Sequence, residues 1–300
     1  MIFLSFLISI ALNTSVITDY FANDAIAQEV EMVAGVEEVF DSPDRVYHTK
    51  SIGVVLSAPN SIVLDMITGD VLWEQNSDEV VSIASITKLV SVAVLLEQGI
   101  NFSDIVTIKS QDQRPVGGNR HVYLGEQISV ENLLHSVLIS SDNEALMALV
   151  RYTGLSEEQF VEKMNFWVSK NNLKTLRIAD PTGLDEDNVS SARDLASLVK
   201  IVFEDERIAN ISKKSNYSFV VKNTGRLVRL KNTNRLLDSS FNVIVGKTGF
   251  IDQAGYNFAT KSKVRNNHDV ITVVLGADSI ANRFQDTKAL LYWISENYRW

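Results

Sequence analysis

Apolar side chains are most concentrated between residues 82 and 99, where they follow Lys88 with a single interruption at Ser91. They cover nearly the whole circumference of a helix, which is typical of a helix buried inside a domain. Gly99 provides the positive φ at which such a helix ends. The pattern therefore predicts a central buried helix with polar residues only at its head.

The segments on either side of this helix alternate between strand and helix patterns. A Thr-Gly turn separates two short alternating runs, which predicts a hairpin of residues 61–65 and 70–75. Short irregular strands are expected at 105–108 and 121–124, around a Gly117–Gly118 turn. Helices are expected at 133–139 behind Ser129, at 144–152, after a capping box of Ser156 and Gln159, and after a cap at Ser190 or Ser191.

The remainder of the chain has strand patterns and ends in one helix. The expected strands are 217–222, 226–230, 242–245, 255–260 and 270–275, and the final amphipathic helix is 281–298. Strands at both ends with helices between them predict an α+β fold: an antiparallel sheet flanked by helices, with a mainly helical insertion at about residues 100–215. We expect residues 51–300 to form a single domain.

The first fifty residues differ from the rest. Ile2–Leu12 has the length of a signal-peptide core, and Ala25-Ile-Ala27 offers a cleavage site. We predict a signal peptide at 1–27 and export to the periplasm or another extracytoplasmic compartment; an uncleaved anchor or a buried N-terminal helix is the alternative. Residues 28–50 are acidic and are expected to form a flexible lead-in.

Composition restricts the possible chemistry. The 300 residues carry a formal net charge of −9 with no basic run, so no nucleic acid partner is expected. There is no cysteine, and the four histidines have no metal-binding spacing, so neither a thiolate nucleophile nor a metal is expected. With no cofactor indicated, any hydrolysis must use a hydroxyl group.

A hydroxyl and an amine meet at the head of the central helix. Ser85 and Lys88 are three residues apart, which places both side chains on one helix face. This is the geometry of a serine nucleophile beside a lysine base. The chain has a second copy, Ser197 and Lys200, which lies in the middle of a predicted helix and is expected to face solvent.

Two further motifs separate these copies. Ser141-Asp-Asn143 follows the first copy at a break between helices, and Lys247-Thr-Gly249 follows at the end of a predicted strand. Ser-x-Asn is common in this chain, whereas Lys-Thr-Gly occurs once. The three motifs in this order are jointly specific, and Ser197 has no Ser-Asp-Asn after it.

With these motifs the chain resembles the low-molecular-mass penicillin-binding proteins, the D-alanyl-D-alanine carboxypeptidase and endopeptidase family. The similarity also includes Ile83-Ala-Ser-Ile-Thr-Lys-Leu89, Asp180-Pro-Thr-Gly-Leu184, Asn188-Val-Ser-Ser-Ala-Arg-Asp-Leu195, Asn232-Thr-Asn234 and Lys247-Thr-Gly-Phe250. Several of these look more like the endopeptidase branch. The resemblance implies a β-lactamase/transpeptidase-like fold, and a serine peptidase that cleaves D-Ala cross-bridges, the terminal D-Ala of peptidoglycan stem peptides, or both. It also implies β-lactams as covalent inhibitors.

The roles then follow for each residue. Ser85 attacks the carbonyl, Lys88 accepts its proton in the neutral form, and Ser141 relays a proton. Burial and a second cation, Lys247, are expected to lower the pKa of Lys88. The remaining substrate-binding assignments are Asn143 for a substrate amide, Lys247 and Thr248 for the terminal carboxylate of the substrate, and Gly249 for its backbone. The backbone N–H groups of Ser85 and Phe250 are assigned to the oxyanion hole.

Two alternatives stay open. A β-lactamase would need a Glu-x-x-Leu-Asn motif between the second and third motifs, and the nearest sequence, Glu162-Lys-Met-Asn165, has the wrong spacing. A wall-binding or penicillin-binding module that keeps the fold without turnover is the second alternative, and the three intact motifs argue against it. Because the chain stops just after the final helix, no C-terminal membrane anchor is expected.

Overall fold

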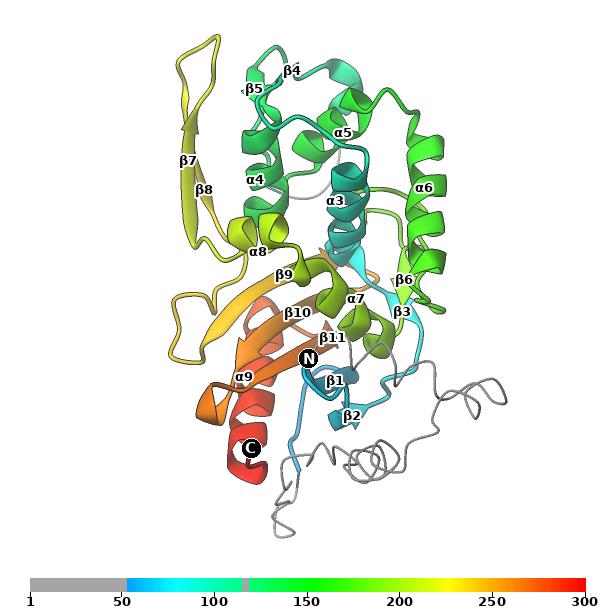
Figure 1. Ribbon diagram of the computed structural model, residues 1–300, viewed down its shortest axis with the longest axis vertical. Coiled ribbons are helices and arrows are strands. Elements are labelled where there is room, and N and C mark those ends of the chain that lie inside the picture. The colour runs from blue at the N-terminus through cyan, green and yellow to red at the C-terminus, as the bar shows by residue number, and fades with distance from the viewer. Residues whose placement is uncertain (1–52, 115–118) are drawn as a thin grey trace, which may run out of the picture. The chain divides into compact units, whose positions relative to one another are not determined.

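Strands from the first and last parts of the described chain form one five-stranded antiparallel sheet (Figure 1). The computed structural model describes residues 53–114 and 119–300, so the predicted signal peptide, the acidic lead-in and the Gly117–Gly118 turn lie outside the described residues. The strand order is β2-β1-β11-β10-β9. The strands are β1 Asn60–Asp65, β2 Val71–Gln75, β9 Val243–Ile251, β10 Gly255–Lys263 and β11 Asp269–Ala277.

Side chains that alternate along the central strands divide the core into two layers. Ile62, Ala259 and Val273 belong to a cluster with α7 (Ala192–Glu204), on the side of the helices. Their neighbours Val63, Phe258 and Val274 pack with α9 (Ile280–Asn297). Because successive strand side chains point to opposite faces, this period of two fixes which helix covers which face.

The helices between β2 and β9 lie mainly beyond one end of the sheet (Figure 1). Besides α7 they are α3 Lys88–Glu97, α4 Val130–Ser140, α5 Asn143–Tyr152, α6 Glu157–Lys170 and α8 Glu206–Ser212. The predicted helix starts are confirmed: the side chains of Ser129 and Ser191 accept backbone N–H groups, and Ser156 with Gln159 forms the capping box. The predicted α+β fold class is confirmed as well.

Short strand pairs also form outside the five-stranded sheet. They are β3 (Val81–Ser82) with β6 (Val189–Ser190), β4 (Ile105–Thr107) with β5 (Gln127–Ser129), and the hairpin β7 (Asn216–Val220) with β8 (Leu227–Lys231). The predicted strand at 121–124 is wrong, because β5 begins at Gln127. His121 and Tyr123 donate their backbone N–H groups to the Asp142 and Glu126 carboxylates, so these groups cannot join a ladder.

Strand β9 also corrects the sequence prediction, which ends a strand at residue 245. The Lys-Thr-Gly motif lies within β9, not at the end of a strand. Glycines at 246 and 249 weaken strand propensity, yet both are required by close packing. A Cβ at Gly246 would approach the Ala259 carbonyl oxygen and the Phe258 ring to 2.9 Å each.

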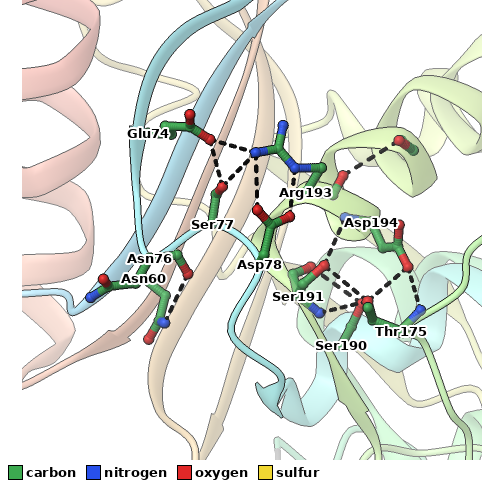
Figure 2. Close-up of polar contacts among 11 residues, drawn as sticks. Asn60, Glu74, Asn76, Ser77, Asp78, Thr175, Ser190, Ser191, Arg193 and Asp194 are labelled. Atoms are coloured by element: carbon green, nitrogen blue, oxygen red, sulfur yellow. Dashed lines mark hydrogen bonds and ion pairs between the residues drawn. The ribbon is translucent and has the colours of Figure 1, made fainter.

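An exposed cluster of charges anchors the start of α7 to the connection between β2 and β3 (Figure 2). The Arg193 guanidinium donates to Asp78 at 2.6 Å and to Ser77 Oγ at 2.9 Å, and also contacts Glu74. The Arg193 backbone N–H donates to the Ser77 carbonyl at 3.0 Å. This connection leads through β3 directly to the head of the central helix.

In the part of the chain that the structure describes, no helix is both long enough and apolar enough to cross a membrane.

Candidate active site

The segment that carries Ser85 has a constrained backbone. Ala84–Thr87 forms a 3₁₀ turn, η1, directly before α3. Ala84 is buried and has φ +49°, a left-handed conformation that costs a non-glycine residue free energy and must be held by its surroundings. Just before it, the Ile83 N–H donates to the Asn188 carbonyl at 2.9 Å. The half-buried Ser85 therefore sits on a backbone that is fixed before any substrate arrives.

Two glycines enclose this segment from opposite elements. A Cβ at Gly183 would come within 2.1 Å of the Ala84 carbonyl oxygen, and Gly183 has φ +80°. On β9, a Cβ at Gly249 would come within 2.6 Å of the Ile83 carbonyl oxygen and 3.2 Å of the Ser85 nitrogen. Only hydrogen fits at either position. Gly249 therefore brings the edge strand of the sheet against the Ser85 backbone.

Lys88 lies beneath Ser85 and is completely buried. Its Nζ donates to Ser85 Oγ at 2.8 Å and to the Thr182 carbonyl, which also accepts from Ser85 Oγ at 3.4 Å. Burial among the apolar side chains of α3 lowers the pKa of Lys88 from 10.5 to about 7. A substantial fraction of this amine is therefore neutral at neutral pH and able to accept a proton.

One of the two causes predicted from the sequence is confirmed. Burial lowers the pKa of Lys88 as expected, but the charges that act on it are the carboxylates of Asp180, Asp142 and Glu144, which raise it, and not the cation of Lys247. Charge repulsion between the two amines lowers the pKa of Lys247 instead. Burial and the charge of Lys88 hold that pKa well below 10.5. Two buried amines so arranged carry fewer than two protons at neutral pH.

Ser141 and Asn143 lie at the break between α4 and α5. Ser141 ends α4 in a left-handed conformation, with φ +64°. Asp142 caps α5 by accepting the Ala145 N–H at 3.0 Å, and burial raises the pKa of its carboxyl. Asn143 is the buried first residue of α5. This break places the Ser141 hydroxyl opposite β9, where Lys247 Nζ donates to it at 2.8 Å.

The residues of β9 line the other side. Lys247 is buried and also donates to the Thr248 carbonyl at 2.9 Å. Thr248 donates its hydroxyl to Thr233 Oγ1 at 2.8 Å. Phe250 is 44% exposed and stacks on Tyr256 with ring centroids 4.2 Å apart. The structure thus links Ser85 to Lys88 and Ser141 to Lys247, and brings Gly249 against Ser85.

Three groups that contact the site residues were not predicted from the sequence. The Thr182 carbonyl and the Thr233 hydroxyl belong to segments whose only sequence signal is their resemblance to a family. Arg283 of α9 had no signal at all; it donates to the Gly249 carbonyl at 3.2 Å, and burial lowers its pKa to about 10. A backbone carbonyl has no sequence signature, and one arginine in an amphipathic helix is unremarkable.

Known proteins are similar to this chain over most of its length. The D-alanyl-D-alanine carboxypeptidase family matches residues 47–279. A D-alanyl-D-alanine endopeptidase of Haemophilus influenzae is 34% identical over 238 residues, 78% of this chain and 80% of that protein. A D-alanyl-D-alanine carboxypeptidase of Escherichia coli is 35% identical over 247 residues, 77% of this chain and 60% of that protein. The Streptomyces K15 DD-transpeptidase structure superposes with a TM-score of 0.75 at 26% identity, covering 81% of this chain and 98% of that one.

The fold and the three motifs define a serine acyl-transfer enzyme of the penicillin-binding type. The chain belongs to the D-alanyl-D-alanine carboxypeptidase family of serine peptidases, and is a hydrolase of that family. The family, fold class and enzyme class predicted from the sequence are confirmed.

Proposed function

We propose that this protein hydrolyses D-Ala-D-Ala-type bonds in peptidoglycan stem peptides through an acyl intermediate on Ser85. One observation carries the assignment: a buried amine with a pKa of about 7 lies 2.8 Å from the hydroxyl of a half-buried serine. A serine hydroxyl becomes an effective nucleophile only when such a base takes its proton.

In the first step, Ser85 Oγ attacks the carbonyl carbon and its proton passes to neutral Lys88. The C–N bond then breaks, and the proton held by Lys88 passes through the Ser141 hydroxyl, which Lys247 contacts, to the leaving amine, so that Lys88 is neutral again. In the second step, water attacks the ester, returns the Ser85 hydroxyl and releases the acid. Lys88 serves as the proton acceptor in both steps.

The edge strand β9 aligns the substrate in this scheme. An extended peptide adds to an open sheet edge through backbone hydrogen bonds. Gly249 brings this edge against η1, so that the N–H groups of Ser85 and Phe250 can donate to the carbonyl oxygen that becomes negative. Loss of one such donor costs on the order of 10²–10³ in rate in other acyl-transfer enzymes. Asn143, at the head of α5, binds a substrate amide from the opposite wall.

The substrate carboxylate needs a permanent positive charge. The sequence assigned this charge to Lys247 with Thr248, but the buried Lys247 has a lowered pKa and its amine faces Ser141, which favours the proton-relay role. Arg283 keeps its charge at neutral pH, and no acidic residue of the described chain forms an ion pair with it. We assign the carboxylate to Arg283 and the Thr248 hydroxyl.

Opening of D-Ala cross-bridges is the activity we favour over trimming of the terminal D-Ala. Ile83-Ala-Ser, Asn232-Thr-Asn234 and Lys247-Thr-Gly-Phe250 support it by their likeness to the endopeptidase branch. Two relatives named endopeptidase, from Pseudomonas aeruginosa and Haemophilus influenzae, are matched over 77% and 80% of their length. We further propose export of the protein to the compartment that holds its wall substrate, and β-lactams as covalent inhibitors of Ser85.

The test is digestion of two defined muropeptides, a monomeric pentapeptide and a D-Ala cross-linked dimer, with products identified by mass. Conversion of the dimer to monomers is the expected result, and Ser85→Ala should abolish it. Release of D-alanine from the pentapeptide alone would make the protein a carboxypeptidase. Failure to cleave either substrate, with the protein folded, would leave a binding module and overturn the proposal.

A further inference from the structure

A buried asparagine links the nucleophile segment to the turn beside it. The Asn188 side chain is completely buried, and its backbone carbonyl accepts the Ile83 N–H at 2.9 Å. On the other side, Asn188 Oδ1 accepts the Ala179 N–H at 3.1 Å and Nδ2 donates to an Asp180 carboxylate oxygen. One residue thus holds both walls around Ser85 at a fixed separation.

The Asp180 carboxylate accepts hydrogen bonds from five donors. Its Oδ2 accepts the Thr182 N–H at 2.9 Å and the Thr182 hydroxyl. Its Oδ1 accepts the Gly183 N–H at 2.9 Å, the Asp185 N–H at 3.2 Å and the amide of Asn188. A carboxylate is the only side chain that can accept at both ends in this way, because an amide has one acceptor oxygen.

This arrangement determines where the Thr182 carbonyl points. That carbonyl accepts from Lys88 Nζ and from Ser85 Oγ, so it orients both reacting groups. The same turn contains Gly183, against the Ala84 carbonyl. Any rotation of the turn therefore moves the base and the nucleophile backbone together.

Asp180 also acts on Lys88 through charge. Asp180 from the turn, with Asp142 and Glu144 at the head of α5, raises the pKa of Lys88 against the effect of burial, and Asp180 has the largest charge effect of the three. The charged group that faces Lys88 from β9 is the Lys247 amine. Removal of the Asp180 charge should therefore make Lys88 lose its proton at lower pH.

We propose that Asp180, held by Asn188, is a positioning residue for acylation that fixes the Thr182 carbonyl against Lys88 and Ser85. The proposal rests on the proposed function, since it deepens the role of the same site. It predicts two separable consequences of changing Asp180, one from geometry and one from charge.

The experiment measures the rate at which a fluorescent penicillin acylates Ser85 between pH 5 and pH 9. Asp180→Asn keeps the size but loses the charge and one acceptor; its rate should fall about 10- to 100-fold at pH 8, because small displacements of reacting groups cost rates of this order. The pH below which its rate declines should also move down. Asp180→Glu keeps the charge but lengthens the side chain. Its acylation rate should therefore fall, while the pH below which the rate declines should stay at the wild-type value. Asp187→Asn, an exposed residue of the same loop, should change neither quantity.

A uniform fall in the Asp180→Asn rate at every pH, or an unchanged rate, would overturn the proposal. If Asp180→Asn does not fold, Asp180→Glu and Thr182→Val decide, since Thr182→Val removes only the hydroxyl donor; unchanged acylation in both would overturn it. Wild-type protein that is not acylated on Ser85 would contradict the proposed function itself. If the wild type is acylated but the Asp180 variants keep its rate and pH profile, only the present proposal is contradicted.

Discussion

The chain contains Ser-x-x-Lys twice, and the two copies differ in everything except their spacing. At the first, Lys88 is completely buried and its amine lies 2.8 Å from Ser85 Oγ. At the second, both residues are half-buried in the middle of α7, and the Ser197 hydroxyl donates to the Arg193 carbonyl one turn back, at 3.4 Å. Within the described residues, the Lys200 amine makes no hydrogen bond or ion pair.

The difference lies in what the fold places around each pair. Burial lowers the pKa of the Lys88 amine to about 7, so a substantial fraction of it is neutral at pH 7 and can accept a proton. A strained backbone at Ala84, enclosed by Gly183 and Gly249, fixes the hydroxyl. A regular helix at residues 197–200 offers neither feature. Spacing brings a hydroxyl and an amine to one face, and the environment decides whether they react.

The largest effect should follow from replacing the base. Lys88→Arg should lower the rate of acylation by penicillin about 10²- to 10⁴-fold, because a guanidinium cannot deprotonate at working pH. Lys200→Arg is the matched control and should keep the wild-type rate. Stopped-flow fluorescence with a labelled penicillin measures both. A folded Lys88→Arg protein with the wild-type rate would remove Lys88 from the mechanism.

The pH profile of the wild-type protein sharpens the same contrast. Lys88 must be neutral to act, and its pKa is lowered to about 7, so acylation should be present above pH 7 and be lost as the pH falls below it. The rate at pH 5 should be about a hundredfold below that at pH 8. A rate that falls only below pH 5, or one that rises until pH 10, would contradict the assignment of this pKa to the base.

Substitution of the glycine beside the nucleophile distinguishes the effect of backbone strain from the effect of close contact with Ala84. Gly183 and Gly154 have nearly equal φ values, +80° and +79°, but of the two only Gly183 lies so close to another segment that an added methyl group would meet it within 4 Å. Gly183→Ala should lower acylation about tenfold or more, since it displaces Ala84 and Ser85. Gly154→Ala should lower the melting temperature through backbone strain and leave the acylation rate unchanged. Equal acylation rates in the two variants would show that close packing of Gly183 against Ala84 and Ser85 does not contribute to reactivity.

The smallest effect is expected at the exposed cluster of Figure 2. Arg193→Ala breaks contacts with Glu74, Ser77 and Asp78, but the pairs are open to solvent, where such interactions contribute little. The Arg193 backbone N–H still holds the Ser77 carbonyl. Acylation should change less than twofold, as measured with the same penicillin. A tenfold loss would show that this cluster, and not the buried Asn188 link, sets the nucleophile position.

Much of this architecture could be predicted from the sequence because it depends on local signals. The apolar circumference of α3 predicts its burial, and the side chains of Ser129 and Ser191 mark helix starts at the observed positions. The spacing of Ser85 and Lys88 predicts their contact, and the resemblance to a family groups Ser141 and Lys247 with them in one site.

The rest depends on contacts between distant segments. The Thr182 carbonyl reaches Lys88 across 94 positions of sequence, and it belongs to the backbone, which looks the same at every residue. Arg283 reaches the Gly249 carbonyl from a helix predicted only as an amphipathic end. The sequence underestimates the length of β9 because its glycines serve packing against β10 and η1, which no local propensity describes.

We propose that Ser85, and not Ser197, is the nucleophile. Mass spectrometry of the intact protein after incubation with benzylpenicillin, followed by peptide mapping of the adduct, distinguishes the two serines. One penicilloyl group is expected on the peptide that contains Ser85, retained in Ser197→Ala and absent in Ser85→Ala. An adduct that survives Ser85→Ala, or no adduct on folded wild-type protein, would contradict it.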